Sequence, residues 1–321
     1  MLGVLLPIFL LIAAGYGVAR LRLVGEDGVK ALSDLAFVLF LPALLFRSMA
    51  RTDFASFPAL APLAYFGTAI TLFLVSYGVL RGYGLDARRA TVFGMSGVFA
   101  NTVMVGIPVV RLAYGEPGLA VLLSIVALHA LVLLSVATLV VELGERGSRR
   151  QRGGQGADRE GDSPRWLRTL AEVARSAVLH PVILPILAGF AWALTGWTLP
   201  APVDTTLALI GGAAPTLCLV LLGASLVRFD PRAHWAVALR LTLVKSFAHP
   251  VAVYAAGRWL FGLDALTLAV LTVAASLPVG ANVYLLAQRY QVGLGTVSAG
   301  ATLSTVATGL TIGPLLALLA P

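Results

Sequence analysis

Two asparagines stand inside long uncharged stretches of this 321-residue chain, and each has a proline and a glycine close by. The first stretch reads SGVFANTVMVGIPVV and holds Asn101 and Pro108; the second reads VAASLPVGANVYLLA and holds Pro278 and Asn282. Proline lacks a backbone N–H and clashes with the preceding helical turn, so both sequences predict a broken helix. An amide beside such a break can donate to a carboxylate, or accept from a proton or cation.

The breaks themselves favour an anion. If each helix restarts at its proline, a preferred first-turn position, two half-helix N-termini point toward each other from opposite sides. Each carries about half a positive charge and unpaired N–H groups, so a carboxylate could be held without a buried arginine. The residues expected to bind it are Asn101, Thr102, Gly106, Pro108, Pro278 and Asn282. Alternatively, these prolines and glycines only kink the helices, as is frequent in membrane spans, but the paired Asn-plus-Pro pattern favours binding.

Two basic residues inside apolar stretches are further candidates for handling substrate or protons. Lys245 lies about nine residues into the stretch 236–260, and His249 follows it by one helical turn. Charge within a membrane indicates function by default, although the long Lys245 side chain could instead reach back to water and anchor the helix. Arg111 ends the first broken stretch, where it could line an outer path or meet lipid headgroups. His129 is interpreted as a core histidine.

The residue types exclude several kinds of site. A single cysteine, Cys218, excludes an intrachain disulfide and a cysteine-based metal cluster. The four histidines form no His-x-x-x-His pair, so neither a metal nor a cofactor is expected. No cluster of catalytic side chains indicates an enzyme. No carboxylate stands at the middle of an apolar stretch, which favours uniport, or coupling through a less obvious group, over a sodium site.

Composition places these residues in a membrane. The chain is 59% hydrophobic and 12% charged, against about 25% charged residues in soluble domains. A helix needs about 20 apolar residues to cross the hydrocarbon layer. Uncharged runs of that length are 1–19, 54–80, 90–110, 117–141, 176–203, 205–227, 265–288 and 290–321. Two more runs, 31–50 and 236–260, are interrupted by charge, and the set predicts an all-α polytopic membrane protein with ten transmembrane helices.

Basic residues are distributed unevenly between the connections. The N-terminal run lacks the leading positive charge of a secretory signal, so we expect it to be a first spanning helix that enters from outside. With that orientation, sixteen Lys and Arg residues fall in cytoplasmic connections and four in the opposite ones. The positive-inside rule then predicts an inner-membrane protein with both termini outside. The net charge of +8 therefore indicates orientation and contact with membrane lipids, and no nucleic acid partner is expected.

The chain divides into two halves around a hydrophilic segment. Residues 144–168 hold six glycines, seven arginines and four acidic residues, a composition that predicts a flexible cytoplasmic linker. The tetrapeptide Gly-Leu-Asp-Ala occurs at 84–87 and again at 262–265, each time before a stretch with asparagine and proline. Residues 1–143 and 169–321 are therefore expected to be two repeats of five helices. Because five is odd, the second repeat would be inverted, as in secondary transporters that bind substrate between their repeats.

Four motifs resemble the auxin efflux carrier family: FLPALLF at 40–46, FANTVMVGIP at 99–108, KSFAHP at 245–250 and LPVGANVYLLAQRY at 277–290. The prokaryotic members of that family include organic-acid permeases of the malonate type. The resemblance covers nearly the whole chain except the linker. It implies a scaffold made by the first, second, sixth and seventh helices, often dimeric. The third to fifth and eighth to tenth helices would form a moving transport domain.

The resemblance also implies that the fourth and ninth helices, 90–110 and 265–288, cross at the substrate site. Asn101, Gly106 and Pro108 match the family's first crossing segment, and Pro278 and Asn282 match the second. The linker is much shorter than in plant auxin carriers, so auxin is not implied, and a small dicarboxylate such as malonate is the expected class of substrate.

The expected function is therefore elevator-type transport of a small organic anion by a homodimer. Small residues of the seventh helix, such as Gly211 and Gly223, could allow close contact between subunits, or could pack within one. Two alternatives stay open: a bile-acid-type sodium symporter of similar architecture, and a membrane sensor or channel. The sequence does not give the substrate, the coupling ion or the direction of net flux.

Overall fold

The described chain is built almost entirely of helices. The computed structural model describes residues 2–51, 60–151, 182–225, 227 and 235–319, and within them the β-structure is one isolated bridge. The α-helices (α) and π-helical turns (η) are α1 (Leu2–Arg20), α2 (Glu26–Leu35), η1 (Ala36–Phe40), α3 (Leu41–Ala50), α4 (Leu60–Gly82), α5 (Ala87–Ser96), η3 (Thr102–Gly106), α6 (Ile107–Gln151), α8 (Ile183–Leu194), α9 (Ala201–Gly212), α10 (Ala214–Ser225), α11 (Trp235–Leu243), η5 (Val244–Ala248), α12 (His249–Ala255), η6 (Ala256–Leu260), α13 (Ala265–Ser276), α14 (Ala281–Tyr290) and α15 (Leu294–Leu318). Of the predicted linker, the part up to Gln151 continues α6, and residues 152–168 lie outside the described residues.

Several of these helices have the length and apolar character of membrane spans. Six stretches of the described chain qualify: Glu26–Ala50, Leu60–Gly82, Thr102–Glu145, Ala201–Ala224, Trp235–Leu260 and Leu294–Leu318. Shorter apolar helices occupy Phe9–Arg20, Ile183–Leu194 and Ala265–Ser276. The predicted all-α polytopic membrane protein is thereby confirmed. The number of ten spans and their inverted arrangement stay predictions, because length and composition do not show how each helix crosses the bilayer.

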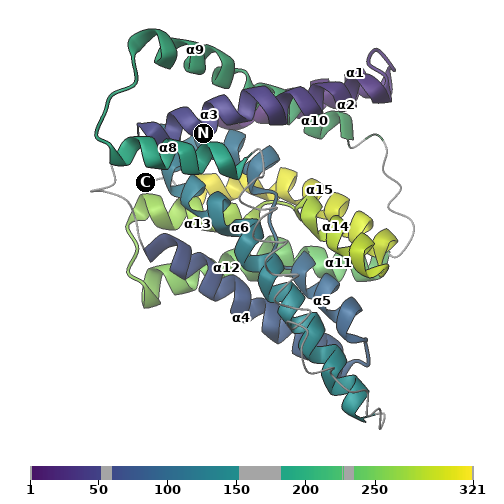
Figure 1. The fold of residues 1–321 in the computed structure, drawn as a ribbon. Helices are drawn as coiled ribbons and strands as arrows, with labels where there is room; N and C mark the ends of the chain where they lie inside the picture. The colour runs from purple at the N-terminus through teal and green to yellow at the C-terminus, as the bar shows by residue number, and fades with distance from the viewer. Residues whose placement is uncertain (1, 52–59, 152–181, 226, 228–234, 320–321) are drawn as a thin grey trace, which may run out of the picture.

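The helices lie in two groups, which Figure 1 shows one above the other. The first group consists of α1, α2, η1, α3, α8, α9 and α10, in which α1 packs along α10 and α3 packs against α8 and α9. The second group consists of α4, α5, α6 and α11 to α15 with the turns η3, η5 and η6, and in it α5 packs on α4 and α6, α12 on α13, and α11 on α15. Helix α6 and turn η3 of the second group contact α10 of the first.

Glycines bring α1 and α10 into direct backbone contact. A Cβ atom on Gly15 would lie 1.9 Å from the carbonyl oxygen of Val220, and one on Gly223 would lie 1.9 Å from that of Ile12. In lipid, helices associate through such close packing because burial of apolar surface gives no drive between them. Gly211 likewise packs against α3. Gly211 and Gly223 thus pack inside one chain, and the homodimer stays a prediction.

The repeated Gly-Leu-Asp-Ala tetrapeptide builds the same turn twice. Gly84 and Gly262 adopt positive φ angles of 84° and 59°, a conformation that costs glycine little. Asp86 and Asp264 each accept a hydrogen bond at 2.9 Å from the backbone N–H three residues further on. These caps start α5 and α13, the two helices that lead into the broken segments. An internal repeat would produce this likeness.

Candidate functional site

Two helices of the second group are interrupted within the protein. The first break, residues 97–101, separates α5 from η3, and the second break, residues 277–280, separates α13 from α14. Neither helix restarts at its proline. Pro108 lies beyond the first restart, in the first turn of α6, and Pro278 lies inside the second break.

Different residues start the helices that follow the two breaks. Asn101 caps η3, since its Oδ1 accepts a hydrogen bond from the N–H of Met104 at 3.2 Å. Asparagine is among the preferred N-cap residues, which explains a restart at Asn101 and not at Pro108. Gly280 precedes α14 and provides no side-chain cap. The asparagine of the second segment, Asn282, lies in the first turn of α14, and its side chain forms no hydrogen bond with the described residues.

The two breaks pair with each other through an isolated antiparallel bridge. The N–H of Asn101 donates to the carbonyl of Pro278 at 2.8 Å, and the N–H of Gly280 donates to the carbonyl of Phe99 at 3.0 Å. A Cβ on Gly280 would lie 2.9 Å from the carbonyl oxygen of Ala100, so only glycine permits this approach. Backbone groups freed inside a membrane must find partners within the protein, and here the breaks satisfy one another.

Side chains from α6 and α15 satisfy further groups at the crossing. The N–H of Ala100 donates to Nε2 of His129 on α6 at 3.2 Å. On α15, Ser304 accepts a hydrogen bond from the N–H of Val279 at 3.0 Å, and Thr308 donates to the last carbonyl of α13 at 2.9 Å. The crossing is therefore held by both its own backbone and two neighbouring helices.

Lys245 forms a hydrogen bond at the end of α13, directly before the second break. Its side chain is 0% exposed, its Nζ donates to the carbonyl of Ala275, and Nζ lies 3.4 Å from Nδ1 of His249. The interpretation that Lys245 reaches back to water is therefore wrong. Its position is explained by the end of α13, since the unpaired carbonyls of a helix C-terminus accept hydrogen bonds from such a donor. Lys245 is not among the residues that line the neighbouring cavity.

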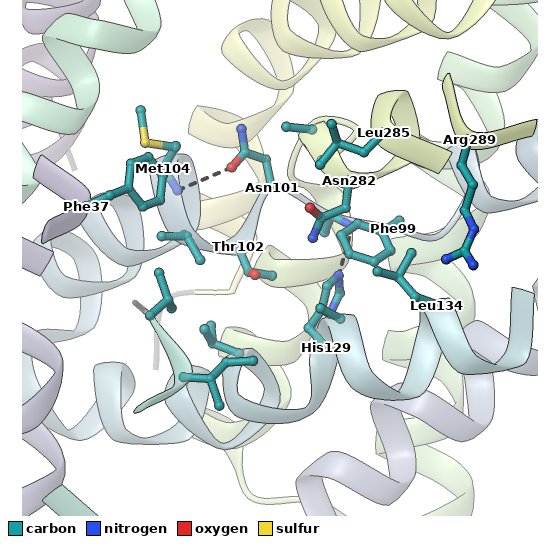
Figure 2. Close-up of a pocket in the computed structure, with 18 residues that line it drawn as sticks. Phe37, Phe99, Asn101, Thr102, Met104, His129, Leu134, Asn282, Leu285 and Arg289 are labelled. Atoms are coloured by element: carbon teal, nitrogen blue, oxygen red, sulfur yellow. Dashed lines mark hydrogen bonds between the residues drawn. The ribbon is translucent and has the colours of Figure 1, made fainter. Parts of the chain in front are cut away.

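A cavity of about 570 Å³ lies beside the crossing, and Figure 2 shows its lining. The volume is typical of small-molecule sites. Its polar and charged lining residues are Asn101, Thr102, His129, Asn282 and Arg289. The structure thus brings together three of the residues predicted to bind substrate. Phe37 of η1 and Ile183 of α8 add apolar surface from the first helix group, so the cavity lies between the two groups.

The polar groups in this lining are mostly hydrogen-bond donors. Asn282 and Arg289 form no hydrogen bond or ion pair with the described residues. Asn101 uses its oxygen for capping, which leaves its amide nitrogen as a donor. None of the described residues that line the cavity is acidic. Helix α14 also begins here, so the positive end of its dipole meets the cavity. This arrangement suits a negatively charged ligand.

Four further residues predicted from sequence lie outside the lining. A Cβ on Gly106 would lie 2.8 Å from the Leu277 side chain, so Gly106 makes room for the second break. Pro108 is in the first turn of α6, and Pro278 contributes its carbonyl to the crossing. Arg111 forms an ion pair with Glu116 at 3.1 Å.

Two lining residues were interpreted differently from the sequence. Arg289 is one of the sixteen basic residues assigned to cytoplasmic connections and is not among the predicted site residues, yet it follows Asn282 by seven residues on α14, with Leu285 between them. Spacings of three and seven place residues on one helix face, and this signal could have found Arg289. His129 was interpreted as a core histidine. It is buried and also lines the cavity, and no local sequence pattern indicates its contact with the first break.

Known proteins resemble the chain over most of its length. Residues 1–313 match the family described as "Membrane transport protein". A protein of Rhizobium meliloti (strain 1021) named "Putative malonate transporter" is 26% identical over 327 residues, which cover 99% of this chain and 95% of that protein. An "Uncharacterized transporter" of Methanothermobacter thermautotrophicus is 24% identical over 224 residues, which cover 69% of this chain and 66% of that protein.

Proposed function

The chain belongs to the membrane transport protein family, and we propose that it carries a small organic anion through a site at the crossing of its two broken helices. Membership confirms the resemblance to the auxin efflux carriers. It makes the chain a multi-pass membrane transporter and not an enzyme. The name of the R. meliloti relative mentions malonate, and a dicarboxylate of that size is the substrate proposed here.

The observation that carries this proposal is the charge character of the cavity. Its lining offers the amides of Asn101 and Asn282, the guanidinium of Arg289 and the N-terminus of α14, and no acidic side chain is among the described lining residues. Helix N-termini bind carboxylates and phosphates through free N–H groups and the helix dipole. A carboxylate at the crossing would therefore gain hydrogen bonds that the protein alone leaves unmade.

The spacing along α14 favours a dicarboxylate. Asn282 and Arg289 are separated by about 10 Å along the helix axis. Helical side chains lean toward the N-terminus, so the long Arg289 side chain can extend back toward the crossing. One carboxylate at the N-terminus of α14 and a second one nearer Arg289 would both meet donors. A monocarboxylate would use only one of these places.

We propose that the second helix group moves against the first during transport, in an elevator-type motion. The first group corresponds to the predicted scaffold, and the second corresponds to the predicted transport domain. Residues of both groups line the cavity, so a shift of the second group would carry the crossing and its ligand past the first. Backbone pairing between the breaks supports movement of the crossing as one unit.

The remaining architecture belongs to the same proposal. It comprises ten spans in two inverted halves, 1–143 and 169–321, with the segment 144–168 on the cytoplasmic side. Both termini would lie outside the inner membrane, as the asymmetry of basic residues favours. We also propose that two copies of the chain form a homodimer through the first helix group.

Purified protein in liposomes provides the test. We expect saturable uptake of labelled malonate, and a rise in melting temperature with malonate, since a ligand that binds the folded state stabilises it. Arg289→Gln should weaken binding about tenfold, equivalent to about 1.4 kcal/mol. Arg111→Gln is the matched control and should bind like the wild type, because Arg111 pairs with Glu116 away from the cavity.

Three outcomes would contradict the proposal. If malonate and other small carboxylates give no uptake and no shift in melting temperature, the proposed substrate class is refuted. Uptake that requires sodium would favour the bile-acid-type symporter. Unitary currents in place of saturable flux would favour a channel.

A further inference from the structure

Lys245 is a buried amine without an acidic partner among the described residues. Its side chain is 0% exposed, and its neighbours are the carbonyl of Ala275 and Nδ1 of His249. An ammonium ion taken out of water without a counter-ion loses several kcal/mol of solvation. A single carbonyl and a neutral imidazole offset only part of that loss.

Aromatic rings connect Lys245 to the cavity. The ring centroid of His249 lies 5.6 Å from that of Tyr65, and the Tyr65 ring lies 5.7 Å from that of His129, which lines the cavity. All four side chains are buried. We call Lys245, His249, Tyr65 and His129 the buried basic cluster; it runs from the cavity to the end of α13.

Three polar atoms of the buried basic cluster have no partner among the described residues. They are Nε2 of His249, the hydroxyl of Tyr65 and Nδ1 of His129. Buried polar atoms are normally hydrogen-bonded, either directly or through water. The three unpaired atoms on successive rings are therefore positions where a buried water could bond and carry a proton from ring to ring.

The described elements around Lys245 contribute no acidic group that could balance a positive charge on it. Its own segment contributes His249, α4 contributes Tyr65 and α6 contributes His129. Helices α13 and α15 contain no charged residue, and the charged residue of α11 is Arg240, whose side chain is exposed. A proton added to this cluster would remain uncompensated until an anion arrives.

His129 connects the state of the cluster to the crossing. The N–H of Ala100 donates to Nε2 of His129, so that nitrogen carries a lone pair and the ring hydrogen is assigned to Nδ1. Protonation of Nε2 would remove the acceptor of Ala100. Proton occupancy beside the cavity and the geometry of the first break are therefore linked.

We propose that the buried basic cluster is a proton-binding site, with Lys245 as the proton acceptor, and that the transporter moves a proton together with its organic anion. This rests on the proposed function. A proton from water forms an N–H bond at Lys245 when the anion enters the cavity, and it returns to water when the anion leaves on the other side. The bound proton stabilises the bound anion, and the anion stabilises the proton by the same free energy, because such coupling is reciprocal.

Anion accumulation in liposomes at zero membrane potential tests this directly. With one proton per anion, a gradient of one pH unit, acid outside, should raise the steady-state accumulation of labelled malonate about tenfold. An internal pH dye should report acidification when malonate is added outside. Arg240→Gln, which removes an exposed cation five residues before Lys245, is the matched control and should keep both responses.

Lys245→Arg separates charge from proton release. Arginine keeps the positive charge and is not deprotonated in proteins, so this variant should bind malonate but lose the response to the pH gradient. Protonation of malonate itself changes accumulation by the wild type and by Lys245→Arg equally. The difference in accumulation between the two proteins therefore reports the proton bound at Lys245. A gradient response in Lys245→Arg equal to that of the wild type would overturn the proposal. Malonate uptake by the wild type without any gradient response would overturn it too, and would leave the proposed function intact.

A second measurement needs no substrate. If Lys245 gives up its proton on folding, the unfolded chain binds more protons, so stability rises with pH relative to a variant without the amine. The melting temperature of the wild type minus that of Lys245→Met should therefore rise as the pH rises. If Lys245→Met does not fold, Lys245→Arg takes its place in the same comparison. A difference that stays constant would refute the proton site even if malonate is not transported.

Discussion

The two helix breaks carry the same residue types, but they obtain their hydrogen bonds from different sources. Apart from its bridge to the second break and the bond from Ala100 to His129, the first break, 97–101, is completed by residues close to it in sequence, because α5 closes with turn hydrogen bonds and Asn101 caps η3. The second break, 277–280, depends on other helices. Lys245 and Thr308 meet the carbonyl end of α13, and a serine of α15 accepts one of its N–H groups.

Because of this difference, the two asparagines are expected to have different roles, one in the stability of the fold and one in ligand binding. The side-chain oxygen of Asn101 accepts a capping hydrogen bond. Asn282, in contrast, has no hydrogen-bond partner among the described residues and lines the cavity. Removing one partner of a hydrogen bond destabilises the fold, whereas removing an unpaired side chain does not. We therefore expect the asparagine of the second break to contribute mainly to ligand binding, and that of the first break to contribute also to the stability of the fold.

The largest effect should come from the glycine that lets the breaks meet. In Gly280→Ala the new Cβ would lie 2.9 Å from a backbone carbonyl oxygen at Ala100, which cannot move aside as a side chain can. We expect a loss of about 1–3 kcal/mol in the free energy of unfolding, together with loss of most transport. Thermal unfolding and liposome uptake measure the two effects.

Glycines elsewhere provide the matched controls for that change. In Gly97→Ala the Cβ would meet a methyl group of Val244 at 2.8 Å, and that side chain can rotate, so a smaller loss is expected. Gly67 on α4 has no atom within 4 Å of its added Cβ, so Gly67→Ala should be neutral. Equal losses in Gly280→Ala and Gly67→Ala would show that close approach at the crossing does not matter.

Asn282→Ala should affect binding without affecting the fold. We expect the affinity for the anion to fall about tenfold, equivalent to about 1.4 kcal/mol, because a donor facing the ligand is removed. The melting temperature without ligand should stay unchanged. Melting curves with and without malonate measure both quantities, and retained affinity would remove Asn282 from the site.

Asn101→Ala should instead lower stability by about 1 kcal/mol through loss of the N-cap, in addition to weakening binding. Asn101→Asp distinguishes the two roles. Aspartate caps as well as asparagine does, so stability should return, but its negative charge beside the cavity should still repel the anion. If Asn101→Asp binds malonate as well as the wild type does, Asn101 is only a cap.

Pro108→Ala should have the smallest effect. The first helix breaks at 97–101 and restarts at the Asn101 cap, and Pro108 lies in the first turn of α6 beyond it. We expect a change in stability within about 0.5 kcal/mol and uptake close to that of the wild type. A severe loss of uptake would mean that Pro108 maintains the break.

The sequence predicted where the helices would break but not where they would resume. Pro108 and Asn101 are both start signals for a helix, and local pattern alone could not rank them. The structure shows that the capping hydrogen bond of Asn101 starts the helix. The membrane environment was also predictable, since long uncharged runs have few other uses.

By itself, the sequence determined the class of protein, the helical segments and the two broken stretches, because charge, hydrophobicity and proline act over short distances along the chain. Only the tertiary structure decided which groups meet. It pairs residues near 100 with residues near 279, brings His129 to the first break and directs Lys245 to the end of α13. The reason is physical: each of these groups is satisfied by a partner on another helix, and no local periodicity specifies that partner.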